Sequence, residues 1–105
     1  MNEHSAKAAV PTPNASRYLQ QLCKHWAHNL AVEFTDNEGT IVFPKDMRGQ
    51  SFPGDGTVRL QAQENALDVV VIASSPEQLE GLKGAIAKHL DRFAFREAPL
   101  TFDWL

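Results

Sequence analysis

Three of the four histidines in the 105-residue sequence fall in two short stretches, and their spacing suggests a metal site. His25 and His28 are three positions apart, so on a helix their imidazole rings are neighbours on one face. His89 would complete the site if the two helices that carry these residues pack side by side. The sequence therefore offers these three residues as ligands of a metal ion or a haem. In the alternative, His25 and His28 are partly exposed, and His89 is hydrogen-bonded at the core edge.

Two arginines in the second stretch are candidates for an anion site. Arg92 and Arg96 could clamp a carboxylate or a phosphate, for which planar guanidinium groups are suited. Together with Asp91 and Glu97 they form a mixed-charge cluster at the expected end of a helix. Such residues more often cap helix carbonyls and form structural ion pairs. The complete set of expected ligand-site residues is His25, His28, His89, Arg92 and Arg96.

The single cysteine, Cys23, is a candidate nucleophile because a histidine lies near it in the sequence. It falls on the apolar stripe of a predicted helix, between Leu19 and Ala27, where cysteine usually behaves as a small buried hydrophobe. His25 is only two positions away, so its side chain points elsewhere around the helix. Gly54, Asp55 and Gly56 lack the lysine and the following helix of a phosphate-binding loop. No catalytic motif emerges, and we expect a non-enzymatic protein.

Composition restricts the class of protein. With 43% hydrophobic and 22% charged residues, the 105 residues are expected to form one globular domain spanning 1–105. A net charge of −3 argues against a nucleic-acid partner. The longest apolar run, residues 69–73, is too short to cross a membrane, and residues 1–4 do not resemble a secretory signal. The lone cysteine agrees with a reducing compartment, so a cytoplasmic location is expected.

Two amphipathic helices must position the candidate residues. Thr12 and Pro13 predict the start of the first helix, and Asn29 its end. Its apolar stripe comprises Tyr18, Leu19, Leu22, Cys23, Trp26 and Ala27. Ser75 and Pro76 predict the start of the second helix, with Gln78 closing a capping box. Its expected inner face comprises Leu79, Leu82, Ile86, His89 or Leu90, and Phe93. Gly81 and Gly84 are expected to allow close approach of a neighbouring backbone.

The remaining segments have the patterns of strands. Alternating apolar residues predict strands near residues 32–34, 58–63 and 100–104, and short apolar runs predict strands near residues 6–10, 40–43 and 66–73. The segment 67–72 is apolar on both faces, so it is either central and covered on both sides or part of a subunit interface. Between the third and fourth strands, residues 45–56 form a long loop that is either held down by Met47 and Phe52 or serves as a lid over a site.

The order β-α-β-β-β-β-α-β defines the fold class. Strands joined by short turns pair antiparallel, and two striped helices must cover one face of the sheet. The sequence therefore predicts an α+β two-layer sandwich with a mostly antiparallel sheet and two helices on one face. Its topology is similar to that of the TATA-binding protein, a likeness of architecture that carries no function.

Two segments and the closing tryptophan resemble a known family. Residues 18–28 read YLQQLCKHWAH, residues 89–97 read HLDRFAFRE, and Trp104 follows near the end. Together they resemble the bacterial domain-of-unknown-function family 2218 over residues 6–104, with Trp26 where phenylalanine is expected. The resemblance implies the fold but no activity. It also implies an accessory role in siderophore or iron metabolism, because relatives occur beside or fused to flavin-dependent siderophore-interacting proteins.

The sequence therefore predicts three alternative functions. The first is a non-enzymatic binding or accessory domain, with a small ligand or a siderophore-interacting flavoprotein as its partner. The second is a metal- or haem-binding protein that uses the helix histidines. The third is a homo-oligomeric interaction domain, with a homodimer formed through the apolar strand at residues 67–72.

Overall fold

The computed structural model describes residues 4–47 and 50–105, without the side chains of Met47 and Gln50. Helices and strands follow one another as β1 (His4–Pro11), α1 (Ala15–Trp26), β2 (Ala31–Phe34), β3 (Glu38–Phe43), β4 (Asp46–Met47), β5 (Gln50–Ser51), β6 (Gly56–Ala62), β7 (Ala66–Ala73) and α2 (Pro76–Phe93).

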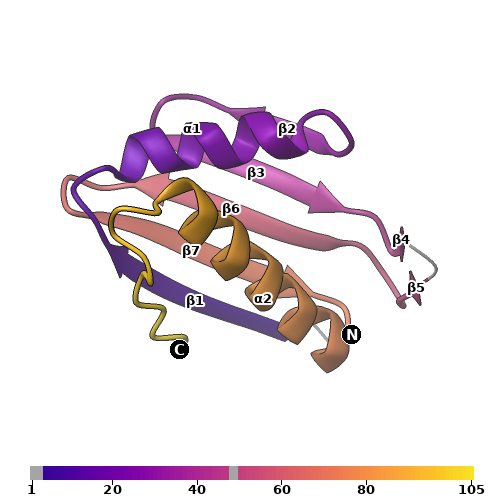
Figure 1. Ribbon diagram of the computed structural model, residues 1–105. Helices are drawn as coiled ribbons and strands as arrows, with labels where there is room; N and C mark the ends of the chain where they lie inside the picture. The colour runs from indigo at the N-terminus through magenta and orange to yellow at the C-terminus, as the bar shows by residue number, and fades with distance from the viewer. Residues whose placement is uncertain (1–3, 48–49) are drawn as a thin grey trace.

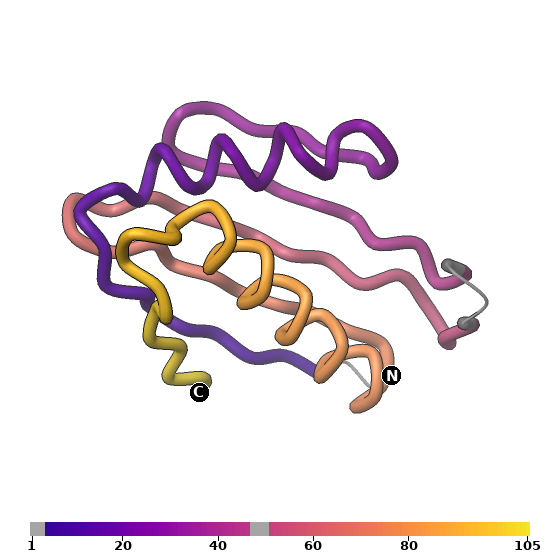
Figure 2. The backbone as a smooth tube through the Cα atoms, in the orientation of Figure 1, coloured from indigo at the N-terminus to yellow at the C-terminus, as the bar shows by residue number. Residues whose placement is uncertain are grey.

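The main sheet is antiparallel throughout and has the strand order β1-β7-β6-β3-β2. Strands β4 and β5 pair as a separate short hairpin, which extends beyond the ends of β3 and β6 (Figure 1). Both helices lie on the same face of the five-stranded sheet (Figures 1 and 2). The predicted two-layer α+β sandwich with two helices on one face is confirmed.

The last strand of the predicted order, near residues 100–104, is reduced to a single pair of backbone contacts. Lys7 and Leu105 exchange reciprocal backbone hydrogen bonds of 3.2 and 2.8 Å, which hold the end of the chain beside β1. The rest of residues 99–105 forms no strand, although Phe102 and Trp104 stack with their ring centroids 5.7 Å apart. This segment packs its aromatic rings against the core cluster instead of extending the ladder.

The core lies between the sheet and the helices because β1, β3, β6 and β7 bury alternate side chains on that side. In β7, Leu67, Val69 and Val71 are fully buried, whereas Val70 and Ile72 are half-buried on the opposite face. Of the two possibilities for this apolar strand, cover on both faces is therefore wrong for the described residues. The face away from the helices is open.

Helix α1 begins later and ends earlier than the sequence predicts. Thr12 does not serve as its N-cap, because the helix begins at Ala15 after Asn14. The Thr12 hydroxyl accepts a bond from the Asn14 amide at 3.1 Å and is itself buried. At the other end the helix stops at Trp26, and residues 27–29 form turns that lead into β2.

Helix α2 begins as predicted, but the side-chain hydrogen bond of the predicted capping box has a different partner. The Ser75 hydroxyl accepts a hydrogen bond from the Gln78 amide at 3.1 Å, and Pro76 is the first helical residue. The Gln78 side chain is buried, but it reaches Ser74 instead of Ser75, accepting the Ser74 amide hydrogen at 2.6 Å. Its amide nitrogen also donates to the Gly54 carbonyl at 3.0 Å, which ties the helix to the loop between β5 and β6.

Close approach between helix and sheet depends on glycines in the strands, not in the helix. The expectation for Gly81 and Gly84 is wrong, because a Cβ at either position would meet nothing within 4 Å. In β3, a Cβ on Gly39 would lie 2.7 Å from the Cys23 sulfur of α1. A Cβ on Gly56 in β6 would lie 2.6 Å from Leu82 of α2. Each helix therefore rests on one strand glycine.

Two further predictions concern the loop at residues 45–56 and the absence of a membrane-spanning segment. Phe52 is half-buried and lines a cavity beside α2, as expected of a residue that holds the loop down. The side chain of Met47 lies outside the described part of the structure. Within residues 4–47 and 50–105, neither helix is long and apolar enough to cross a membrane.

The glycine contacts predict opposite effects of the same substitution. Gly39→Ala should destabilise the fold by about 1–3 kcal/mol, because the new methyl group overlaps the Cys23 sulfur in a packed core. Gly84→Ala should stabilise it by about 1 kcal/mol, since alanine favours the helix and the added methyl group meets open space. Urea unfolding monitored by circular dichroism measures both, and a neutral Gly39→Ala would contradict the packing argument.

Candidate functional site

The aromatic and imidazole rings of the two sequence motifs meet where α1 ends against the last two turns of α2. The His89 ring lies 4.7 Å from the Trp26 ring and 5.1 Å from the His25 ring, centroid to centroid. Trp26 also contacts Phe43 of β3 edge to face at 5.0 Å. Phe93, one helical turn beyond His89, completes the group at 5.9 Å from His25. The two motifs therefore form a continuous cluster of rings between the helices.

A groove of about 500 Å³ opens beside this cluster. One wall is α2, the other is formed by the ends of α1 and β3, and the loop after β5 closes one end. Its ring-bearing lining residues are Trp26, Phe43, Phe52 and His89. Glu77 and Ser51 also line it and are exposed, so the lining combines flat apolar surface with a few polar groups.

His89 has a defined tautomer in this groove. Its Nδ1 lies 2.7 Å from the Ala85 carbonyl oxygen, one helical turn earlier. A carbonyl can only accept, so Nδ1 carries the proton and donates. In the neutral ring, Nε2 therefore keeps its lone pair for a ligand or a proton.

His25 lies in a cationic setting. Desolvation, followed by electrostatic repulsion from His89, Arg92 and His28, holds the pKa of His25 below its usual value of 6.5. His25 is therefore neutral at pH 7. Three of the other expected site residues, His28, His89 and Arg92, therefore lie close enough to His25 to affect its protonation.

The three histidines do not form the expected three-ligand cluster. Among the described residues, no three or more histidine, cysteine, aspartate or glutamate side chains are placed together to hold a metal ion. His25 and His89 lie side by side, whereas His28 is exposed in the turn after α1. Two imidazoles are the largest part of the predicted metal site that the structure brings together.

Arg96, the fifth expected residue, lies apart from the histidines. It lines a separate 240 Å³ hollow with Arg17 of α1, and its guanidinium lies 5.7 Å from the centre of the Phe95 ring. The expected ion pairs of Arg92 and Arg96 are wrong within the described residues, where both arginines are exposed. Asp91 instead accepts the Leu100 amide hydrogen at 2.9 Å, so it holds the chain that follows α2.

Glu97 has a role that sequence reasoning missed. Its carboxylate accepts hydrogen bonds from Tyr18, from Asn14 at 3.0 Å and from Thr12 at 2.8 Å. The bonds from Tyr18, Asn14 and Thr12 hold the pKa of Glu97 below 4.5, and the same contact raises the pKa of Tyr18 above 10.0. Glu97 thereby ties the segment after α2 to the start of α1. Tyr18 and Glu97 belong to different motifs, which is the one sequence signal of their contact.

Cys23 is a core residue, as its place on the apolar stripe indicates. Its side chain is fully buried between α1 and β3, and burial raises its pKa to about 11. The thiol is therefore protonated at neutral pH and does not act as a nucleophile.

The strand order, the two helices on one face and the ring-lined groove define a class of small α+β domain with one exposed sheet face. The chain belongs to the family described as "Uncharacterized protein conserved in bacteria (DUF2218)", whose model matches residues 7–105. The resemblance seen in residues 18–28 and 89–97 is thereby confirmed.

A solved structure shares the fold. It is described as the NMR structure of PA4090 from Pseudomonas aeruginosa, and it is 29% identical to this chain. The match covers 96% of this chain and 94% of the other, with a TM-score of 0.73. No curated protein matches the sequence. The comparisons therefore support the fold and the family, and they name no ligand.

The Glu97 contacts predict a loss of stability in acid. Glu97→Gln should cost about 1–3 kcal/mol at pH 7, because Tyr18, Asn14 and Thr12 lose a charged acceptor. The pKa of Glu97 is lowered by folding, so its contribution is complete above pH 4.5 and declines as the pH falls below that value. Urea unfolding between pH 7 and 3 should therefore show a shallower decline for the variant than for the wild type.

The matched control is Glu64→Gln in the exposed turn between β6 and β7. It should change the free energy of unfolding by less than about 0.5 kcal/mol. Equal pH profiles for Glu97→Gln and the wild type would contradict the role of this carboxylate.

Proposed function

We propose that the chain is a non-enzymatic binding domain for a planar aromatic acid, held in the groove between α1, α2 and the β5 loop. The observation that carries the proposal is the ring-lined groove, whose rings include His89, with basic groups beside it. A planar ligand can stack on such rings or pack against their edges, which gains about 0.5–1.5 kcal/mol per pair beyond area burial.

Charge supports an acid over a base. Arg92, which carries a permanent positive charge, lies close enough to His25 to lower its pKa, and His25 lies beside His89. A carboxylate or phenolate next to this group would be stabilised, whereas a cation would be repelled. At the other end of the groove, Ser51 and Glu77 are exposed and can accept hydrogen bonds from ligand hydroxyl groups.

Hydroxylated benzoates have this combination of a flat ring, a negative charge and hydroxyl donors. They are also the iron-binding units of catecholate siderophores. The family resemblance, through its link to flavin-dependent siderophore-interacting proteins, supports the same class of ligand. The proposed role is thus to carry or present such a unit to a partner, not to transform it.

Binding can be followed through tryptophan fluorescence. In a Trp104→Phe background, emission comes from Trp26, which lines the groove. Dihydroxybenzoate should quench it saturably with one site per chain. Phe52→Ala should weaken the affinity roughly tenfold, which corresponds to about 1.4 kcal/mol. The variant removes a ring from the closing loop and leaves the core helices in place.

The matched control is Phe95→Ala, because Phe95 is 71% exposed and lies outside the groove. This variant should bind dihydroxybenzoate like the wild type. Cyclohexanecarboxylate, which has the charge without the flat ring, should bind at least roughly tenfold more weakly. If dihydroxybenzoate fails to quench Trp26, or if Phe52→Ala binds it equally well, the proposal is wrong.

A second candidate function uses the histidine pair as metal or haem ligands. It is favoured by the 5.1 Å spacing of the His25 and His89 rings and by the Ala85 carbonyl, which leaves Nε2 of His89 free to ligate. The neutral state of His25 at pH 7 also suits a ligand. The positive charge of Arg92 acts against it, so we place it second.

Thermal unfolding distinguishes this second candidate from the first. If His25 and His89 bind a metal, Zn²⁺ at a hundred times its dissociation constant should stabilise the fold by about 2.7 kcal/mol. His25→Ala with His89→Ala should abolish the shift in melting temperature, and His28→Ala should retain it. No shift with zinc, iron or haem in the wild type would exclude this candidate.

A further inference from the structure

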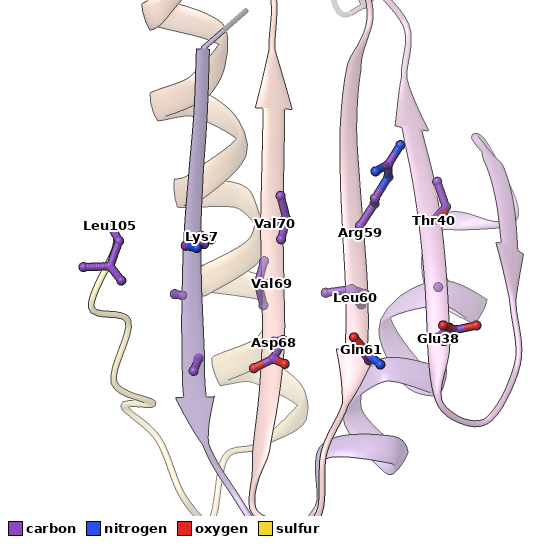
Figure 3. Close-up of a pocket in the computed structure, with 13 residues that line it drawn as sticks. Lys7, Glu38, Thr40, Arg59, Leu60, Gln61, Asp68, Val69, Val70 and Leu105 are labelled. Atoms are coloured by element: carbon purple, nitrogen blue, oxygen red, sulfur yellow. The ribbon is translucent and has the colours of Figure 1, made fainter.

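The face of the sheet away from the helices carries an ordered pattern of charge. Lys7, Arg59, Glu38 and Asp68 point out of this face around a shallow depression of about 580 Å³ (Figure 3). Figure 3 shows the two basic residues at one level of the sheet and the two acidic residues at the next. The depression is unrelated to the groove beside His89, which lies on the helix side.

Strand register defines these levels as two cross-strand rows. The basic row contains Lys7 on β1, Val70 on β7, Arg59 on β6 and Thr40 on β3, and it ends with an exposed acidic residue, Glu33, on the edge strand β2. The acidic row, two residues along each strand, contains Ala9 on β1, Asp68 on β7, Gln61 on β6, and Glu38 on β3. Within the described chain, none of the charges of Lys7, Arg59, Asp68 and Glu38 forms a salt bridge. Asp68 accepts one hydrogen bond, from Gln63 at 3.1 Å.

We propose that a second copy of this chain docks on the open face, forming a face-to-face dimer about a two-fold axis that runs between the two rows. Such an axis keeps each strand over its counterpart and exchanges the rows. The basic row of one copy then faces the acidic row of its partner. Because an interface of this symmetry repeats every contact, one complementary pair gives two.

The contacts follow from the strand order. Arg59 would lie over the partner's β6, with the partner's Asp68 one strand to one side and the partner's Glu38 one strand to the other. Neighbouring strands are about 4.8 Å apart, which is within reach of a guanidinium group. Lys7 on β1 would reach the same Asp68 from the opposite side. Lys7, Arg59, Asp68 and Glu38 of each copy are thereby all used, whereas Glu33 on the edge strand β2 faces the partner's β2 at the rim of the interface.

Other positions of the two-fold axis are electrostatically unfavourable, so one alignment of the two sheets is expected. An axis along the basic row would place Arg59 against Arg59 and Lys7 against Lys7. An axis along the acidic row would oppose the two copies of Asp68 and of Glu38. Like charges placed face to face cost several kcal/mol, so the intermediate position is selected.

Apolar side chains on the same face support the docking. Val70 lies at the centre of the depression, and Ile72 is half-buried in the next row along β7. The same axis brings Ile72 over the partner's Ala66, which occupies the corresponding row on the other side of the axis. Strand β7, apolar on both faces, thus has one face in the core and the other at the centre of the interface.

A charge-exchange experiment with the full chain tests the proposal. Sedimentation velocity of the wild type across the micromolar range should show a dimer that dissociates on dilution and in high salt. An acidic variant, Lys7→Glu with Arg59→Glu, should raise the dimer dissociation constant roughly 100-fold. A basic variant, Glu38→Lys with Asp68→Lys, should do the same, and an equimolar mixture of the two should restore a dimer.

Two controls keep the result interpretable. Circular dichroism establishes that each variant is folded, and Lys88→Glu, on the exposed side of α2, should leave the dimer unchanged. A wild type that stays monomeric overturns the proposal. A dimer that survives both double variants also overturns it, since the interface then lies elsewhere. Neither result depends on ligand binding in the groove, which dihydroxybenzoate quenching measures separately.

Discussion

One-sided burial is the constraint on which the structure depends. The large apolar side chains of β7, β6 and β3 that are fully buried, such as Val71, Val58 and Ile41, all point toward the helices. Helices α1 and α2, of 12 and 18 residues, cover that face and leave the opposite face of the sheet uncovered. Everything else follows from this division. The helix layer must meet the sheet closely, its two helices must be held at a fixed separation, and the other face of the sheet is left to solvent or to a partner.

The two helices are held together at one end by a polar contact and at the other by rings. Glu97 joins the segment after α2 to Tyr18 in the first turns of α1. At the far end of α1, Trp26 packs on His89 from the last two turns of α2. A charged acceptor with three donors has little freedom of orientation, whereas stacked rings can slide. The groove therefore lies at the more adaptable end of the helix pair, where a ligand can be accommodated without breaking a hydrogen bond.

Sequence periodicity was sufficient for both helices and for the five strands of the main sheet, and insufficient for their boundaries and contacts. The apolar run in residues 66–73 and the stripe of α1 depend on neighbouring positions, so they can be read locally. The start of α1 could not be predicted from neighbouring positions, because the Thr12 hydroxyl donates a hydrogen bond to Glu97, 85 residues away. Gly39 beneath Cys23 and Arg17 beside Arg96 are likewise consequences of packing. The motifs correctly brought His25 and His89 together, but the exposed position of His28 depends on where α1 stops, which the sequence misplaced by three residues.

The two proposed surfaces lie on opposite faces of one domain, and this has a consequence for how they would act together. Docking of two open faces would bury the sheets at the centre and leave both helix layers outside. Each groove beside His89 would then face away from the other, so neither would be blocked. A dimer of this kind would present two ligand sites with a fixed spacing, which raises the effective affinity for a partner or ligand that carries two recognition units. A siderophore with several identical catechol rings is such a ligand. Because the sheet buries apolar side chains on one face only, the ligand groove and the dimer interface can occupy opposite faces of the same domain.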